Sequence, residues 1–174
     1  MKRILLVGGL VSVLIVIVFV TGAAAPRQTM PMSSPGFGEH HTKVFFAHDP
    51  ASSTDCAEVR GFSRRTFGPD VLHDAMNQVL RGPREREARM GAWSFFSHRT
   101  AGLINSVRIR SGVAYIDFDD FRHIIPGASS SCGSTSLMEQ LDRTALQFPT
   151  VHSTRFSFEG NRSVFYEWLQ MSPP

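Results

Sequence analysis

Cys56 and Cys132 are the two cysteines of the chain, and a thiol can either act as a nucleophile or pair in a disulfide. A nucleophilic cysteine needs a free thiolate and a neighbouring base. The candidates for that base are His73, His98, His123 and His152. In an oxidising compartment, two cysteines without a third competitor favour a disulfide, which would stabilise the fold by about 4 kcal/mol at most. We therefore expect a Cys56–Cys132 bridge, and a hydrolase that uses Cys56 or a serine with a histidine is the weaker alternative.

Other residue patterns give little support for catalysis or metal binding. The sequence has no Gly-x-Ser-x-Gly segment, which positions the nucleophile of many serine hydrolases. Asp117, Asp119 and Asp120 lack the regular oxygen-ligand spacing of a calcium loop. The adjacent His40 and His41 would point in different directions and have no third ligand beside them. The sequence thus predicts no catalytic residue, no metal site and no cofactor.

The first 25 residues have the composition of an export signal. Lys2 and Arg3 precede an apolar run over 4–20, a charge pattern that keeps the N-terminus in the cytoplasm. The length of this run lies between that of a cleavable signal and that of a membrane span. We expect 1–25 to be a signal peptide, cleaved near Ala25, or a retained N-terminal membrane anchor. In either case the rest of the chain works outside the cytoplasm, secreted or periplasmic after cleavage, or anchored to the cytoplasmic membrane by one helix.

The charge balance argues against a nucleic-acid partner. The formal net charge is +3, but without Lys2 and Arg3 only 16 basic side chains remain against 15 acidic ones. Binding to phosphates needs a concentrated basic face, which this composition does not indicate. Residues 26–42 are rich in Pro, Gly, Ser and Thr and predict a flexible linker, so that the folded domain spans 43–170.

Hydrophobic periodicity places two helices in this domain. The first is expected over 69–81, with Pro69 in its first turn and Gly82-Pro83 beyond its end. Its apolar residues recur every three or four positions and lie on one face. The second helix is expected from about Ser134 or Ser136 to residue 148, where Ser136 and Glu139 have the spacing of a capping box.

Short apolar or alternating segments indicate five or six strands. They lie at 44–47, at 58–66 with Gly61 at a bulge, at 103–118 as a hairpin, at 154–158, and at 164–169 as a last strand or an irregular tail. These elements predict an α/β fold of the α+β-like two-layer type, with two helices packed on a mixed sheet of five or six strands.

The hairpin turns at Ser111-Gly112, and its polar face is the candidate interaction face. A two-residue turn pairs Val107 with Ile116 and Ile109 with Ala114, which places these apolar residues on the core side. The opposite side carries Arg108, Arg110, Tyr115 and Asp117. Arg108, Arg110 and Tyr115 are the residues expected to contact a partner, although a solvated sheet face is the simpler interpretation.

Four segments together resemble the GerMN domain family, named for a spore germination protein. They are Cys56, Val59, Phe62 and Arg64; Leu80, Gly82, Pro83, Glu87 and Gly91; Leu103, Val107, Gly112, Ala114, Ile116 and Asp117; and Ser131-Cys132-Gly133 followed by 144–151. The resemblance covers residues 43–160. It departs from the family at Ala145-Leu146, where Leu-Thr is more usual, and in the serine-rich approach to Cys132.

The resemblance implies an extracytoplasmic accessory module without known catalysis, similar to ring-building domains of sporulation secretion assemblies. We therefore expect a non-enzymatic module for protein–protein interaction or assembly at the bacterial envelope, related to sporulation or germination. Its partner would be an envelope protein or a second copy of the chain, and the membrane if the N-terminal segment is retained. The alternative partner is a cell-wall polymer stacked on Trp93, Phe95 and Phe96.

Overall fold

The computed structural model describes residues 38–174, so the expected export segment and most of the expected linker lie outside the described residues. Within 38–174, no helix combines the length and the apolar character needed to span a bilayer. The strands and helices are β1 (Glu39–His48), β2 (Val59–Phe67), α1 (Val71–Leu80), α2 (Glu85–Ala88), β3 (Ala92–Trp93), β4 (Ile104–Arg110), β5 (Val113–Phe118), α3 (Ser131–Leu146), β6 (Ser153–Phe158) and α4 (Arg162–Trp168).

The first sheet has the strand order β2-β1-β3 and is antiparallel. β1 begins at Glu39, so residues 39–42 belong to the sheet and the linker expected over 26–42 is too long at its C-terminal end. The bulge expected at Gly61 is wrong, because Gly61 pairs with Phe45 in unbroken register. A side chain at Gly61 would approach the Phe45 ring to 3.1 Å, which accounts for the glycine.

The second sheet has the order β4-β5-β6 and is mixed. β4 and β5 form the expected antiparallel hairpin, with Val107 opposite Ile116. Ser111 and Gly112 both have positive φ, at 48° and 79°, as a two-residue type I′ turn requires. β6 then pairs parallel to β5, with Ile116 opposite Phe156. The α/β two-layer class is confirmed, with the six strands divided between two sheets.

Side-chain caps fix where the two long helices begin. Asp70 caps α1 by accepting a hydrogen bond of 3.1 Å from the His73 N–H. Ser130 caps α3 in the same way, accepting 3.2 Å from the Gly133 N–H. α3 therefore starts three residues before the earlier predicted start, and Ser136 is a buried residue inside the helix. The expected capping box at Ser136 is wrong because the stronger local cap lies upstream.

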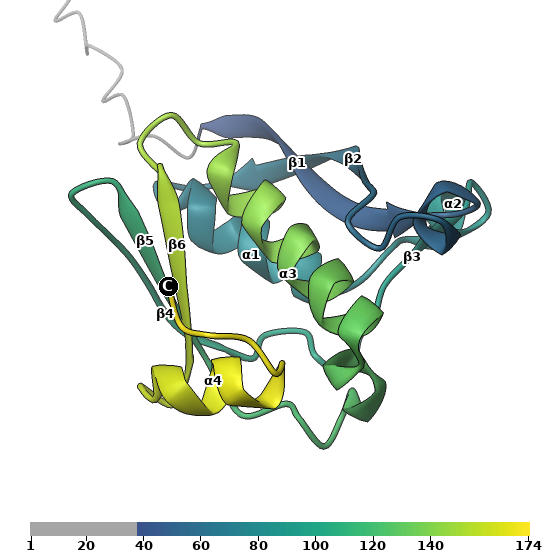
Figure 1. The fold of residues 1–174 in the computed structure, drawn as a ribbon. Coiled ribbons are helices and arrows are strands. Elements are labelled where there is room, and N and C mark those ends of the chain that lie inside the picture. Colours follow the sequence, from purple (N-terminus) through teal and green to yellow (C-terminus); the bar gives the residue numbers. More distant parts are fainter. Residues whose placement is uncertain (1–37) are drawn as a thin grey trace, which may run out of the picture. The chain divides into compact units, whose positions relative to one another are not determined.

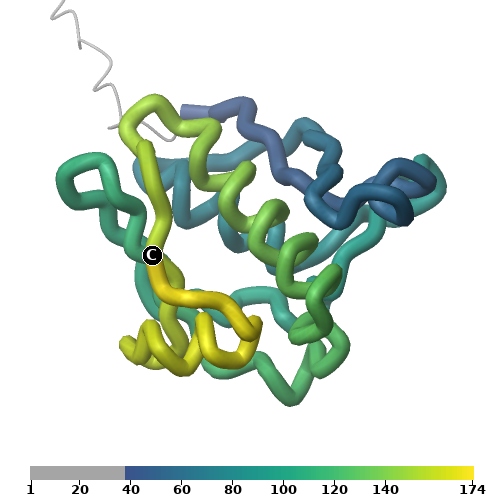
Figure 2. Tube along the Cα trace, in the orientation of Figure 1, coloured from purple at the N-terminus to yellow at the C-terminus, as the bar shows by residue number. Residues whose placement is uncertain are grey.

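α1 and α3 lie side by side and pack against both sheets (Figure 1). One continuous apolar cluster joins β1, β2, α1, β5, α3 and β6. After α3 the chain turns back, and β6 lies beside β5, which was formed about forty residues earlier (Figure 2). The core therefore depends on pairing between segments that are distant in the sequence.

The segment expected to be a last strand or a tail, 164–169, is instead mostly helix α4. Asn161 caps it by accepting a hydrogen bond of 3.2 Å from the Val164 N–H. The helical spacing lets Phe165 and Leu169 turn to the same side, where both are buried. Tyr166 is also buried, and its Oη accepts a hydrogen bond of 3.3 Å from the Phe156 N–H. α4 therefore packs against β6 at the edge of the second sheet.

Candidate interaction face

The second sheet has one buried and one open face, because side chains alternate along its strands. Ala114, Ile116 and Phe118 of β5 are fully buried against the helices. The cross-strand pairs then place Arg108, Tyr115 and Arg155 in one row on the opposite face. Arg108 and Arg155 are separated by two strand spacings, or about 10 Å between backbones.

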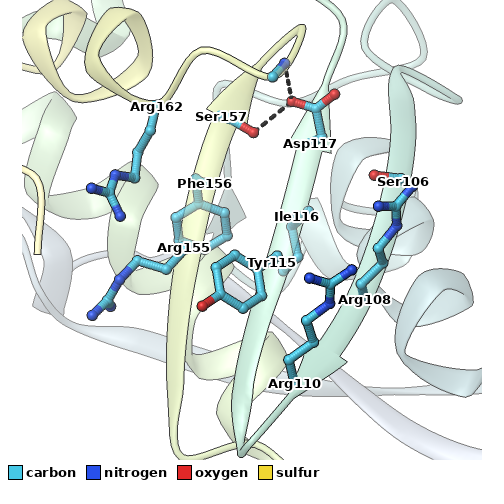
Figure 3. A pocket seen from close by; sticks show the side chains of 11 residues that line it. Ser106, Arg108, Arg110, Tyr115, Ile116, Asp117, Arg155, Phe156, Ser157 and Arg162 are labelled. Carbon is cyan, nitrogen blue, oxygen red and sulfur yellow. Dashed lines mark hydrogen bonds between the residues drawn. The ribbon is translucent and has the colours of Figure 1, made fainter.

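A second row on the same face consists of Ser106, Asp117 and Ser157. Arg110 lies on β4 next to the turn, and Arg162 comes from the first turn of α4 (Figure 3). The side chains surround an open hollow of about 590 Å³. We call this surface the arginine face, and it consists of Ser106, Arg108, Arg110, Tyr115, Asp117, Arg155, Ser157 and Arg162.

The positive charge of the arginine face is not neutralised inside the domain. Within 38–174, none of its four arginines forms an ion pair with a carboxylate. Asp117 is the carboxylate of the face, and its Oδ1 accepts hydrogen bonds from Ser157 Oγ at 2.5 Å and the Gly160 N–H at 2.7 Å. Asp117 therefore holds the turn after β6 and leaves the guanidinium groups free (Figure 3).

The hairpin extends beyond the core, so both of its sides are accessible near the turn. Tyr115, on the arginine face, is 44% exposed. Ile109 lies on the core side, as the predicted register requires, but it is 43% exposed. The end of the β4–β5 hairpin projects away from the helices (Figure 1). Arg108 and Arg110 are exposed as well. The predicted interaction residues thus lie together on an open surface.

Arg155 and Arg162 belong to the same surface but were not recognised in the sequence. Arg155 lies in the strand expected over 154–158, whose neighbouring strand the sequence does not identify, and Arg162 precedes the segment expected over 164–169. Only the parallel pairing of β6 with β5 brings Arg155 beside Tyr115. Arg155 is half-buried, and its Nη1 donates a hydrogen bond of 2.7 Å to the Thr154 carbonyl. In the sequence, Arg155 and Ser157 alternate with Phe156 and Phe158. This alternation indicates that both polar side chains lie on the open face of the strand.

Both cysteines of the chain take part in a disulfide between Cys56 and Cys132, whose Cα atoms are 5.3 Å apart. Cys56 lies in the connection between β1 and β2, and Cys132 lies in the first turn of α3. The bridge therefore links the first sheet to the helix layer across 76 residues of sequence. A bonded Cys56 has no thiolate with which to attack a substrate.

A buried ion pair between Arg64 and Glu87 was also not anticipated. Arg64 is 2% exposed and Glu87 8%, and the guanidinium binds both carboxylate oxygens, with Nη2 and Oε2 2.6 Å apart. Glu87 Oε2 also accepts a hydrogen bond of 2.8 Å from the Arg84 N–H. Burial alone would raise the pKa of Glu87, but these hydrogen bonds outweigh it and lower the pKa. The pair joins β2 to α2, and both residues belong to the segments that resemble the GerMN domain.

Comparisons with known proteins agree with this fold. The family model described as "Germane: Sporulation and spore germination" matches residues 43–164. This chain belongs to the Germane family. The solved tandem GerMN domains of the sporulation protein GerM from Bacillus subtilis are similar, with 19% identity and a TM-score of 0.51. The match covers 71% of this chain and 40% of that one, so this chain spans less than half of the tandem structure.

Two further solved structures match the Germane domain at lower similarity. The first GerMN domain of the same Bacillus subtilis protein has 14% identity and a TM-score of 0.45, with 71% of this chain and 85% of that one covered. A putative lipoprotein from Clostridium perfringens has 11% identity and a TM-score of 0.41, with 71% and 77% covered. No curated protein sequence matches the chain. The resemblance to the GerMN domain is confirmed by the family match.

The alternative catalytic residues of the Germane domain are dispersed. His98, His123 and His152 are exposed, and the His73 ring lies beside Asn77 and Asp74 on α1. Between residues 38 and 174, no serine hydroxyl is hydrogen-bonded to a histidine ring. The structure therefore does not bring together the pair that a serine–histidine hydrolase would use.

The acidic residues at the end of β5 and directly after it do not converge either. Asp117 turns towards Ser157, whereas Asp120 binds the guanidinium of Arg122, with Oδ2 and Nη2 2.6 Å apart. The hydrogen bond from Arg122 lowers the pKa of Asp120. The described part of the chain contains no group of three or more His, Cys, Asp or Glu side chains placed to hold a metal ion.

Trp93, Phe95 and Phe96 cover an edge of the core rather than form an open stacking surface. Phe96 is 2% exposed. Trp93 is half-buried, and its Nε1 donates a hydrogen bond of 2.8 Å to Ser52 Oγ. The Trp93 and Phe95 rings pack edge to face with centroids 5.4 Å apart. These contacts use the ring surfaces that a sugar polymer would need.

Proposed function

We propose that this Germane-family chain is a non-catalytic interaction module that works outside the cytoplasm, at the cell envelope, in sporulation or spore germination. Membership of the Germane family supports the biological process. The basic residues and apolar run at the N-terminus support export. The observation that carries the interaction role is the arginine face, where four guanidinium groups surround an exposed tyrosine without a carboxylate partner.

The composition of the arginine face suits contact with a protein. Arg and Tyr are enriched at the centres of protein interfaces, and they account for much of the binding energy there. A guanidinium can bind a carboxylate through two parallel hydrogen bonds, which fixes orientation as well as providing energy. Tyr115 offers an exposed ring between Arg108 and Arg155. Such a surface can recognise a partner without any chemical step.

Site-specific photocrosslinking in intact cells tests this proposal. A photoreactive amino acid at Ser106 lies on the arginine face, and one at Ser63 on β2 is a matched control on the other sheet. We expect one envelope protein to crosslink from position 106 and not from position 63. The adduct should be lost in the Arg108→Ala/Arg110→Ala variant at the same protein level.

Three outcomes would contradict the proposal. They are the absence of a protein adduct at position 106, equal adducts from both positions, and an adduct with a wall polymer only. The third outcome would favour the cell-wall alternative. A purified chain that converts a substrate, with activity abolished by one polar substitution that leaves folding intact, would overturn the non-catalytic role.

A further inference from the structure

Building on the proposed function, we infer the chemistry of the partner: an acidic, extended polypeptide segment that adds as a strand to the free edge of β4. In this arrangement its alternating carboxylates lie against Arg108 and Arg110. Three observations support this inference. They are the open edge of β4, the spacing of the two arginines on it, and the absence of the same combination at the other sheet edges within 38–174.

The edge of β4 is available for strand addition. β4 is the terminal strand in the order β4-β5-β6, and within residues 38–174 it is hydrogen-bonded to no strand other than β5. Asn105, Arg108, Ile109 and Arg110 are all exposed. Outward-pointing N–H and C=O groups of an edge strand are a template for another chain. A polypeptide backbone can pair with them, whereas a sugar or phosphate polymer cannot reproduce that ladder.

The spacing of the charges defines what the added strand must carry. Arg108 and Arg110 are two residues apart on one side of β4, or about 6.8 Å along the strand. An added strand has the same periodicity, so residues at alternate positions would lie opposite both arginines. Glu or Asp at those positions would provide the carboxylates that the domain itself does not supply. Arg155 and Arg162 extend the positive potential across the face and favour the same sign of partner.

The other sheet edges lack this combination. The outer edge of β6 is covered by α4, where Tyr166 Oη accepts the Phe156 N–H. At the β2 edge, Arg64 is paired with Glu87, and Arg65 Nη1 lies 3.5 Å from Glu39 Oε1. Arg60 contacts His48 at 3.2 Å and is the single β2 arginine without a carboxylate partner within 38–174, so β2 does not offer two such arginines at alternate positions. The remaining edge strand, β3, spans Ala92–Trp93 and carries no arginine. Unpaired arginines therefore coincide with an open strand edge at β4, and this coincidence selects an acidic strand as the occupant.

Peptide binding to the full-length oxidised chain, purified in detergent, tests the inference. The probe is a fluorescent eight-residue peptide in which Glu alternates with Thr, and its control has Gln in place of every Glu. Fluorescence anisotropy should show binding of the Glu peptide that is at least about tenfold tighter than that of the Gln peptide. Arg108→Ala/Arg110→Ala should weaken binding by a similar factor. Arg86→Ala/Arg99→Ala removes two exposed arginines elsewhere and should change it by less than about twofold.

Backbone methylation separates strand addition from simple charge attraction. Two versions of the Glu peptide carry N-methyl groups on alternate residues, one version on each edge of the extended peptide. Only one edge pairs with β4, so one version should lose binding and the other should retain it. Equal effects of the two versions, or equal binding of the Gln peptide, would overturn the inference. Inorganic polyphosphate that displaces the Glu peptide without any edge dependence would identify a general polyanion surface instead.

The two proposals fail in different ways. If photocrosslinking from Ser106 captures an envelope protein but the Glu peptide does not bind, the interaction role stands and the acidic-strand inference is wrong. If the peptide binds in the expected edge-dependent way but no protein is captured in cells, the chemistry of the β4 edge stands and the proposed cellular role is wrong.

Discussion

Two regions of the domain use arginine in opposite ways. In the first sheet, Arg64 is buried and its guanidinium binds both oxygens of Glu87. On the second sheet, Arg108, Arg110 and Arg162 are exposed, and no carboxylate of the described residues pairs with them. A buried charge without a partner is strongly destabilising, so burial enforces pairing at Arg64. An exposed guanidinium remains hydrated, so the folded domain does not need to supply a counter-charge for it. Such a group can instead bind a carboxylate of a partner.

The largest change in stability that tests the contrast between buried and exposed arginines is expected from a substitution at Glu87. Glu87→Ala leaves the Arg64 guanidinium buried without a counter-charge, and we expect the free energy of unfolding to fall by about 3–5 kcal/mol. Urea denaturation measures this change. The matched control is Glu85→Ala, which removes an exposed ion pair with Arg89 and should cost less than about 1 kcal/mol. Similar costs for the two variants would mean that burial does not distinguish the pairs.

The same pair predicts a dependence of stability on acid. The pKa of Glu87 is lower in the folded chain than its ordinary value of 4.5. The ion pair with Arg64 therefore makes its full contribution to stability at pH values above 4.5. The contribution is lost as the pH falls through the folded pKa. The unfolding free energies of the wild type and Glu87→Ala should therefore converge in acid, and parallel curves down to strongly acidic pH would contradict this assignment.

Loss of the disulfide, which links the first sheet to α3, is expected to cause the next largest decrease in the free energy of unfolding. Cys56→Ala/Cys132→Ala should lower the free energy of unfolding by about 2–4 kcal/mol, because the open chain gains freedom over a long loop. Reduction of the wild type should have the same effect, and the double variant should not respond to the reductant. Two titratable thiols in the denatured, unreduced wild type would contradict the bridge and restore Cys56 as a potential nucleophile.

Asp142 provides an intermediate case, a half-buried carboxylate that forms no ion pair within residues 38–174. Burial between α3 and β6 raises its pKa to about 6, although Thr154 Oγ1 donates a hydrogen bond of 2.5 Å to Oδ1. The folded chain binds the proton of Asp142 more tightly than the unfolded chain does. This contribution to stability is therefore fully present at pH values below 3.8, the ordinary pKa, and it is lost as the pH rises through about 6. Asp142→Asn keeps an acceptor for Thr154 and should raise the unfolding free energy at pH 7 by about 1–3 kcal/mol.

Two measurements check that assignment. The gain from Asp142→Asn should shrink as the pH is lowered towards 4, because the wild-type carboxyl then becomes protonated in the folded state. Glu167→Gln removes an exposed carboxylate from α4 and should leave stability unchanged within about 0.5 kcal/mol at any pH. A pH-independent gain at position 142 would show that ionisation is not its cause.

The smallest effect on stability is expected at the arginine face. Arg108→Ala/Arg110→Ala removes exposed charges without internal partners, so the free energy of unfolding should change by less than about 0.5 kcal/mol. Partner binding should nevertheless be lost. A destabilisation as large as that of Glu87→Ala would mean that the face serves the fold, and the contrast between the two arginine environments would disappear.

Local features allowed part of the fold to be predicted. The apolar spacing of α1 and the cap and stop residues around it are local, and the helix was recognised within two residues at its start. The hairpin register was also correct, because a two-residue turn at Ser111-Gly112 allows only one pairing of the flanking residues. The sequence alone therefore places Arg108, Arg110 and Tyr115 on one face.

Other features required distant segments to meet. Asn161 caps α4, where the sequence predicts a last strand or an irregular tail over 164–169, because a helix cap and a turn use the same residue types. The partner of Arg64 lies 23 residues further along the chain, in a charged segment that contains two glutamates, Glu85 and Glu87. Sequence spacing alone could not select Glu87 among them.

The sequence by itself determined the two long helices α1 and α3, the hairpin and its register, and the resemblance to a known family, because these depend on residues close together in the chain. Only the tertiary structure decided that β6 lies parallel to β5, which places Arg155 beside Tyr115 and brings Arg162 to the same face. It also decided which arginine is buried with a carboxylate and which arginines remain open to a partner. The reason is that burial and long-range strand pairing are set by the packing of the whole domain, which no short stretch of sequence encodes.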